Sequence, residues 1–350
     1  MVLAVLAAGE VGARIVGPEI PRTAGTEERA FVKADQMYER GSADVAVLGS
    51  LETAGGLVPS IIEERAPEIG SVYNAALAGT FLPTYQEWAE RVVIPALDPD
   101  VVVIGMLPMT VADIEAVDSA SYTEPRDAYS DAMDQITGGS FGDLGWALRQ
   151  RSALIRYRPE LRQPDQLARG VRAVLRGGDD TAAPGPGTGM DWTTETDPAT
   201  VLANTGPDGE VFDYHASSLP IDADPLGSAI YRTFEEGSLD LQGIEELTAA
   251  LRGDGVEPVI VVLPVDRGPL EAGGADLSVL DAWTASLQDW AADHDVALLD
   301  EFTAPWPSDL FHDRNHLDVD GAAELSRVVG DWLAELCGED RLPGACDGTS

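Results

Sequence analysis

The stretch Asp44-Val-Ala-Val-Leu-Gly49 decides the fold of this 350-residue chain. Its apolar run is unbroken, carries β-branched valines and ends at a glycine, which is typical of a buried strand in a parallel sheet. The residues that follow, Gly49-Ser-Leu-Glu-Thr-Ala-Gly-Gly56, are predicted to turn from this strand into a helix. A strand that leads directly into a helix is the repeating unit of an α/β fold.

Other segments of the chain repeat this alternation. Further strands are predicted at 71–74, 99–105, 259–264 and 296–300. Amphipathic helices are predicted over 27–40, through 85–92, through 280–290 and over 321–336. We therefore expect an α/β fold of the three-layer α/β/α, flavodoxin-like kind, with a mostly parallel five-stranded sheet. The predicted organisation is an N-terminal helix and linker over 1–43, one domain over 44–336 and a C-terminal tail over 337–350.

The net charge of the chain is −39, because 61 acidic residues stand against 22 lysines and arginines. Such a surface repels the phosphate backbone, so the composition argues against nucleic acid as a partner. The first residues, Met1–Gly9, are apolar but too short to span a bilayer. They are either the remnant of a membrane anchor or a plain N-terminal helix. Cys337 and Cys346 either close a small loop in an oxidising compartment or are two free thiols.

A large insertion is predicted between the third and fourth strands, at about 114–240. The segment from Arg149 to Arg176 carries eight of the 21 arginines. It either docks on an anionic lipid surface or polymer, or pairs with the protein's own carboxylates, and internal pairing is the favoured interpretation. Residues 177–210 are rich in Gly, Pro, Asp and Thr, which predicts a flexible loop.

The segment Asp313-Arg-Asn-His316-Leu317 is the strongest candidate for chemistry. An aspartate three residues before a histidine can fix the tautomer of the imidazole, which is the base half of a hydrolytic triad. Ligands of parallel sheets bind outside the carboxyl ends of the strands. The turn at Gly49-Ser50, the segment 74–79, the turn after Gly105 and the loop with His316 are all predicted to lie at that edge.

These four segments resemble, in order and spacing, the conserved blocks of the SGNH (GDSL-type) hydrolase superfamily, and most of all its membrane-associated bacterial acyl-transfer and deacylation branch. The resemblance covers 44–113 and 256–336, and its most specific block is Asp313-Arg-Asn-His316-Leu317. It implies the SGNH hydrolase fold, with Ser50 as nucleophile, His316 as base and Asp313 as the group that orients the histidine. It also implies that the backbone N–H groups of Ser50 and Gly79 hold the oxyanion.

Two positions depart from the pattern of the family. In one register the nucleophile position after Gly49 holds Leu51, and in the other it holds Ser50, with a turn one residue shorter. The first register fits the flanking residues better, whereas the second keeps a serine at the chemistry. The turn after Gly105 also lacks the family's asparagine, whose place is taken by Thr110 or Ala112.

The resemblance implies a serine esterase or O-acyl(acetyl)transferase acting on an ester of a carbohydrate or cell-envelope polymer, in the cell envelope or another extracytoplasmic location rather than in the cytoplasm. The alternative is a catalytically impaired protein of this fold that binds a glycan or a partner in the old cleft. Trp306 and Asn74 are candidates for a substrate wall, although a turn-forming role for Asn74 is as well supported. The chemistry needs no cofactor, and the sequence has no metal-ligand spacing. The N-terminus and the Arg149 to Arg176 segment are the two candidates for membrane association.

Overall fold

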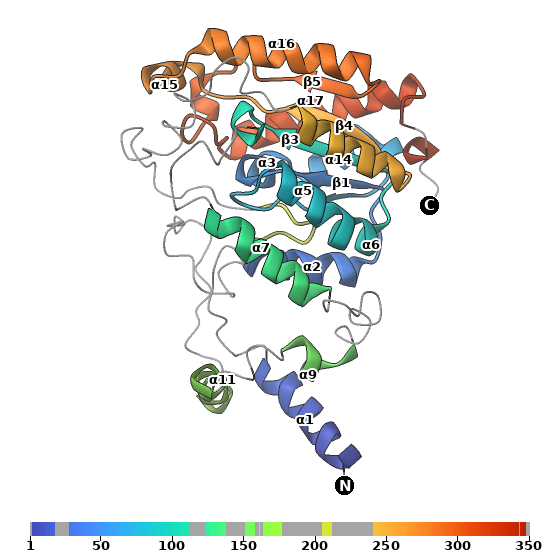
Figure 1. The fold of residues 1–350 in the computed structure, drawn as a ribbon, viewed down its shortest axis with the longest axis vertical. Helices are drawn as coiled ribbons and strands as arrows, with labels where there is room; N and C mark the ends of the chain where they lie inside the picture. Colours follow the sequence, from blue (N-terminus) through green and yellow to red (C-terminus); the bar gives the residue numbers. More distant parts are fainter. Residues whose placement is uncertain are drawn as a thin grey trace.

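A five-stranded sheet forms the centre of the molecule in the computed structural model, with its strands in the order β2-β1-β3-β4-β5 (Figure 1). All neighbouring strands are parallel. The structure describes residues 2–17, 28–111, 123–137, 151–157, 161, 164–176, 205–211, 241–342 and 344–347. The strands are β1 (Val45–Leu48), β2 (Val72–Asn74), β3 (Val101–Met106), β4 (Glu257–Val262) and β5 (Ala297–Asp300). The predicted α/β fold with a parallel sheet is confirmed.

The strand order places Ser50 at a distinctive point of the sheet. β1 and β3 are buried at every residue, as their continuous apolar runs predict. The chain runs from β1 to β2 on one side and then to β3 on the other, so the direction of winding switches between β1 and β3. Ligands of doubly wound sheets bind at this switch, outside the carboxyl ends of the strands. Ser50 follows β1 by two residues and therefore lies at the switch.

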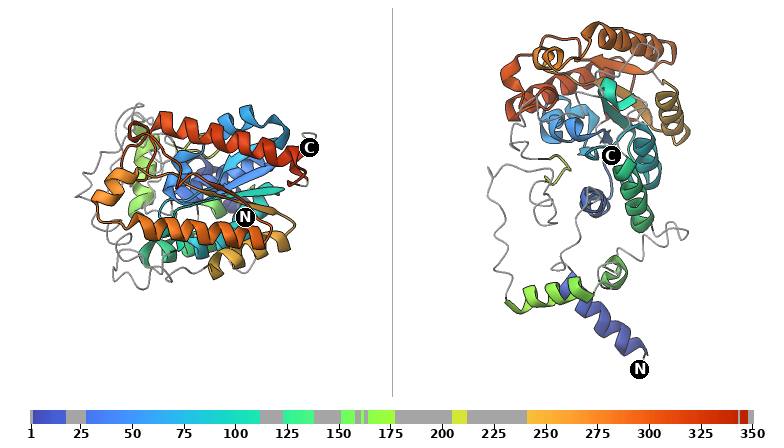
Figure 2. Two further views of the ribbon diagram at one scale, coloured as in Figure 1. Left: turned by 90° about the horizontal axis from the view of Figure 1, so that it is seen from above. Right: turned by 60° about the vertical axis from the view of Figure 1, so that its left-hand side comes forward.

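Helices cover both faces of the sheet (Figure 2, left). The long C-terminal helix α17 (Val319–Gly338) packs against α4 (Pro59–Arg65) and α3 (Leu51–Gly56) on one face, and α14 (Gln242–Gly253) packs against α5 (Leu82–Trp88) on the other. The remaining helices of the described domain are α2 (Glu28–Arg40), α6 (Ile94–Leu97), α7 (Thr123–Ile136), α15 (Arg267–Ala272) and α16 (Leu277–Asp293). A π-helical turn, Ala89–Val93, joins α5 to α6.

One part of the insertion is fixed to the edge of the sheet. Thr205 and Val211 form an antiparallel bridge, and the N–H of Asn74 donates to the carbonyl of Asp208 at 2.8 Å. Beside this turn, Nζ of Lys33 donates to the carbonyl of Asn74 at 2.7 Å, and burial holds the pKa of Lys33 well below its usual range. Residues 205–210 of the loop predicted over 177–210 thus form hydrogen bonds with the edge strand, and 177–204 lie outside the described residues.

A separate group of helices lies at the end of the molecule that carries the N-terminus (Figure 1). Here α1 (Val2–Val16) packs on α9 (Ala153–Arg156) and α11 (Pro164–Arg176). The Glu10 carboxylate accepts the N–H of Ala153 at 2.8 Å, and this bond is the main reason that the pKa of Glu10 falls to about 2. α1 exposes apolar side chains to solvent: Val5, Leu6, Val11 and Ile15. Within the described ranges, none of the helices combines the length and the apolar character needed to cross a bilayer.

Cys337 and Cys346 form a disulfide, which decides between the two alternatives that the sequence left open. The bond ties the last turn of α17 to a short 3₁₀ turn, Ala345–Asp347. In that turn Ala345 is buried against the core, so the disulfide holds the C-terminal segment onto the domain.

The double variant Cys337→Ser/Cys346→Ser is expected to lower the free energy of unfolding by roughly 2.5 kcal/mol, the loop-closure entropy of so short a loop. Urea denaturation of the oxidised wild type and the variant measures this difference, with the reduced wild type as control. Equal midpoints for all three proteins would contradict the expectation, because a bond that constrains the unfolded chain must change its stability.

Candidate active site

The loop before α17 holds His316 in a fixed position. Phe311 and Leu317 form an antiparallel bridge, and the N–H of His312 donates to the carbonyl of His316 at 2.8 Å. Asp318 then caps α17, because its carboxylate accepts a backbone N–H of the first turn at 2.8 Å. Residues 312–316 lie between the two bridged positions, so the histidine is presented by a closed loop.

Asp313 and His316 form the pair that the sequence predicted. Oδ2 of Asp313 lies 2.8 Å from Nδ1 of His316, and Oδ1 accepts the backbone N–H groups of Asn315 and His316 at 2.9 and 2.8 Å. Burial raises the pKa of Asp313, but the charge and hydrogen bond of His316 and the two N–H groups outweigh it and hold this pKa well below its usual range. The carboxylate is therefore ionised at neutral pH and fixes a proton on Nδ1, leaving Nε2 for chemistry.

A carboxylate that the sequence analysis did not single out lies between the serine and the histidine. Oε1 of Glu52 is 3.8 Å from Nε2 of His316 and accepts the side-chain amide of Asn315 at 2.7 Å. Its other oxygen, Oε2, accepts the hydroxyl hydrogen of Ser50. Only 9% of the Glu52 side chain is exposed. The structure thus brings Ser50, Glu52, His316 and Asp313 into one continuous chain of polar contacts.

Two glycines explain why α3 begins close to the ends of β1 and β3. A Cβ atom on Gly49 or on Gly105 would overlap the side chain of Thr53. Thr53 is fully buried. Its side chain fits between these two strand ends because neither glycine has a Cβ atom. This close packing sets the position of Ser50, which stands as the N-cap residue of α3.

Buried hydroxyl groups surround Ser50 on the side of α5. Burial and the nearby Glu52 carboxylate raise the pKa of Tyr85 far above its usual value, and the neighbouring hydroxyl groups of Ser50, Thr110 and Thr80 oppose this rise. The side chains of Tyr85, Thr80 and Thr110 are all nearly inaccessible to solvent. Tyr85 is the second residue that sequence reasoning missed, because its helical spacing indicated core packing alone.

Gly79 and Thr110 are the described residues at the predicted oxyanion positions besides Ser50. Gly79 has φ of 67°, in the left-handed region that favours glycine, and a Cβ there would meet open space. Thr110 accepts the backbone N–H of Leu107 at 3.1 Å, so its hydroxyl hydrogen remains available to another acceptor. Ala112, the other candidate for the place of the missing asparagine, lies outside the described residues.

Asn74 is not part of a substrate wall. It is fully buried, and its amide nitrogen donates to the carbonyls of Thr53, Ala54 and Leu57 at 3.1, 3.2 and 2.8 Å. Its Oδ1 accepts the N–H of Ala76 at 3.1 Å. The side chain therefore bonds the C-terminal end of α3 and the turn after β2, and these contacts favour the turn-forming alternative.

Leu51 faces an apolar cluster. It packs against Ala54, Ala76 and Val211, the last of which belongs to the docked turn of the insertion. The neighbouring Ser50 is the residue whose side chain reaches Glu52. The geometry therefore favours the register in which Ser50, not Leu51, stands at the chemistry.

Replacing Leu51 by serine is expected to give no gain in ester turnover and to lower the free energy of unfolding by about 1 kcal/mol, since it removes a half-buried apolar side chain. Turnover of an aryl acetate and urea denaturation measure the two effects. A large gain in turnover would show instead that the register with Leu51 at the nucleophile position is the right one.

Trp306 is the other residue that the sequence predicted for a substrate wall. Nε1 of Trp306 donates to Glu301 at 3.0 Å, and its ring meets Phe311 edge to face, with centroids 6.4 Å apart. Trp306 thus stands beside the start of the histidine loop. His294 stacks on Trp290, and His215 lies outside the described residues. No group of three or more metal-ligating side chains occurs among the residues that the structure describes.

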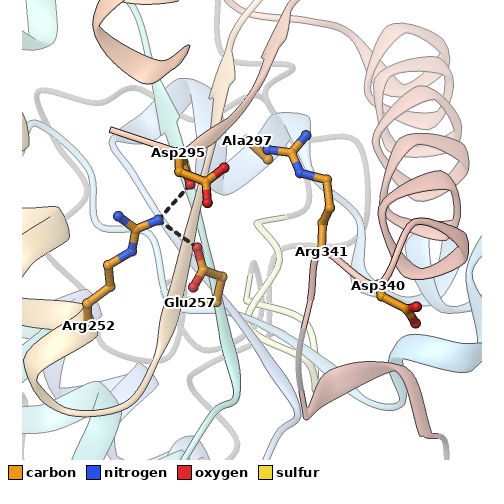
Figure 3. A pocket seen from close by; sticks show the side chains of 6 residues that line it. All are labelled: Arg252, Glu257, Asp295, Ala297, Asp340 and Arg341. Atoms are coloured by element: carbon orange, nitrogen blue, oxygen red, sulfur yellow. Dashed lines mark hydrogen bonds and ion pairs between the residues drawn. The ribbon is translucent and has the colours of Figure 1, made fainter. Parts of the chain in front are cut away.

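A charged pocket occupies the opposite edge of the sheet (Figure 3). Its volume is about 430 Å³, and it is lined by Arg252, Glu257, Asp295, Ala297, Asp340 and Arg341. Arg252 donates to the Glu257 carboxylate at 2.9 Å and to the carbonyl of Asp295 at 2.7 Å. Glu257 begins β4 and Ala297 begins β5, so this pocket is not at the carboxyl edge that carries Ser50 and His316.

Comparisons with known proteins add no relative. No family model matches the chain, and no curated protein matches it closely enough to count as similar.

Proposed function

We propose that this protein is a serine-dependent esterase or O-acyltransferase of the SGNH (GDSL-type) kind, acting on an ester of a carbohydrate or cell-envelope polymer. Ser50 is the nucleophile, His316 the base and Asp313 the group that orients the histidine. The observation that carries the proposal is the 2.8 Å contact between Asp313 and His316, made by a closed loop that also binds, through Asn315, the carboxylate that accepts the Ser50 hydroxyl. An oriented imidazole and a serine that both contact the same carboxylate, at a sheet switch point, suit acyl transfer.

Each group has a defined task in the proposed reaction. Ser50 loses its hydroxyl proton to a base of the site as its oxygen attacks the carbonyl carbon of the ester. The alcohol oxygen takes this proton as its bond to the carbonyl carbon breaks, which leaves Ser50 acylated. A water or a sugar hydroxyl then attacks the acyl group, His316 removes the proton of this second nucleophile, and a proton returns to the Ser50 oxygen as its bond to the acyl group breaks. The ionised Asp313 stabilises the imidazolium that forms. Backbone N–H groups at Ser50 and Gly79 are the proposed donors to the oxyanion.

The disulfide supports an extracytoplasmic location, because disulfides persist mainly in oxidising compartments. The exposed apolar side chains of α1 agree with membrane association at the N-terminal end, where Val5, Leu6, Val11 and Ile15 would meet the lipid.

The second candidate function is that of a catalytically impaired protein that binds a glycan or a partner in the same cleft. The position of Glu52 favours this alternative, because a hydroxyl has one hydrogen to donate, and Ser50 gives it to Glu52. An imidazole that never receives this proton directly would be a poor base for the first step.

Two assays on the full chain separate these functions. The esterase should hydrolyse an aryl acetate, and a fluorophosphonate, which reacts with activated serines, should modify Ser50 and no other residue, as peptide mass spectrometry would show. A protein that neither turns over the acetate nor takes up the label at Ser50 would overturn the esterase proposal and leave glycan binding as the function to test.

A further inference from the structure

Glu52 is a nearly buried carboxylate whose two oxygens both contact polar groups of the candidate site. It receives a hydrogen bond from Ser50 on one oxygen and from Asn315 on the other, and the second oxygen also faces Nε2 of His316. No arginine or lysine is among these partners. Burying a carboxylate is unfavourable unless its oxygens are hydrogen-bonded, and here polar groups of the site supply those bonds.

We infer that Glu52 is a catalytic residue that takes the proton of Ser50 during attack on the ester. The inference rests on the proposed function. His316, oriented by Asp313, then serves the second step, the attack of water or a sugar hydroxyl on the acylated serine. The two steps would thus have different bases, both placed by the loop that carries Asn315 and His316.

The first step is the acylation of Ser50 by the ester. The Ser50 oxygen forms a bond to the carbonyl carbon, the carbonyl electron pair moves to its oxygen, and the hydroxyl proton passes to Oε2 of Glu52. When the carbonyl re-forms, the bond to the alcohol oxygen breaks and the leaving oxygen takes the proton from Glu52. The carboxylate is restored, and acylated Ser50 and a free alcohol remain.

Position decides between the two bases in this step. An imidazole in water is about two pKa units more basic than a glutamate carboxylate, so on strength alone His316 would be preferred. However, proton transfer needs the base within hydrogen-bond reach of the proton, and Ser50 donates to Glu52. Among the residues that the structure describes, the charged and titratable groups near Glu52 are His316, Asp313 behind it, and Tyr85 from α5.

The test is the rate at which a fluorophosphonate modifies Ser50, because this reaction requires the attack step and no second step. Glu52→Gln keeps the shape of the side chain and removes its basicity. We expect this variant to be labelled about 10²-fold more slowly than wild type, within the usual range for loss of a general base. His316→Ala should be labelled nearly as fast as wild type, although its steady-state turnover is lost.

Glu90→Gln provides the control, since Glu90 is exposed on the π-helical turn after α5. Thermal unfolding of each variant shows whether the fold is kept. If Glu52→Gln is folded and labelled as fast as wild type, or faster, Glu52 has only a packing role between Ser50 and His316, and the inference is overturned. The same holds if His316→Ala abolishes labelling while Glu52→Gln does not. Failure of wild type to be labelled at all, or to turn over an ester, would instead overturn the proposed function.

Discussion

Ser50→Ala is expected to lower kcat/KM for an aryl acetate by at least about 10³-fold, which corresponds to about 4 kcal/mol of transition-state stabilisation. The reason is that the variant has no oxygen to carry the acyl group. The fold should survive, because the Ser50 side chain makes no capping hydrogen bond to α3 and its hydroxyl is directed to Glu52. Initial rates over a range of substrate concentrations give kcat/KM, and thermal unfolding gives the state of the fold.

Ser286→Ala is the matched control for this experiment. Ser286 is exposed on α16, and its hydroxyl only donates to the carbonyl one helical turn earlier, at 3.0 Å. It should keep the turnover of wild type. If Ser50→Ala also keeps it, Ser50 is not the nucleophile, and the turnover arises at another group.

The sheet was predictable because its strands are continuous apolar runs. A strand buried on both faces needs no alternation, so 44–49 and 99–105 stand out in a chain as acidic as this one. The docked turn at 205–211 was not predictable, because its composition of Gly, Pro and Asp is that of a loop. Long-range contacts decide its structure: Asn74 pairs with its backbone, and Arg40 forms an ion pair with Asp208.

In the candidate site, too, the local contact was predictable from the sequence and the long-range contacts were not. Asp313 and His316 are three residues apart, and their contact is local, so their spacing alone was sufficient to predict it. Glu52 was missed because its partners Asn315 and His316 are more than 260 residues away along the chain. One signal was present in the sequence: a glutamate directly after Ser50-Leu51, in the turn that the family resemblance places at the reaction centre.

Asn74 shows the opposite error. A polar residue at the end of a strand on the ligand-binding edge was a reasonable candidate for the cleft. Its amide instead donates to the carbonyls of Thr53, Ala54 and Leu57 at the end of α3, which the side chain reaches from β2. A polar residue near a site therefore needs its hydrogen bonds counted before a role in binding is assigned to it.

His316→Ala is the second large effect, with an expected loss of about 10²- to 10⁴-fold in kcat, the range that general-base catalysis supplies. The physical reason is that Asp313 stays ionised near neutral pH and fixes the tautomer of the imidazole, which leaves Nε2 of His316 oriented to take and return a proton. If Glu52 serves the first step, the variant still acylates Ser50 and stalls afterwards. Mass spectrometry should then find the acetylated serine accumulating during the assay.

Two further measurements make this expectation specific. Free imidazole added to His316→Ala should restore part of the lost turnover, because it can occupy the space of the missing ring. His294→Ala, which removes a ring stacked on Trp290, should leave kcat unchanged. If His316→Ala turns over the acetate as fast as wild type, the Asp313–His316 contact serves only to close the loop before α17, and the base must be sought elsewhere, first at Glu52.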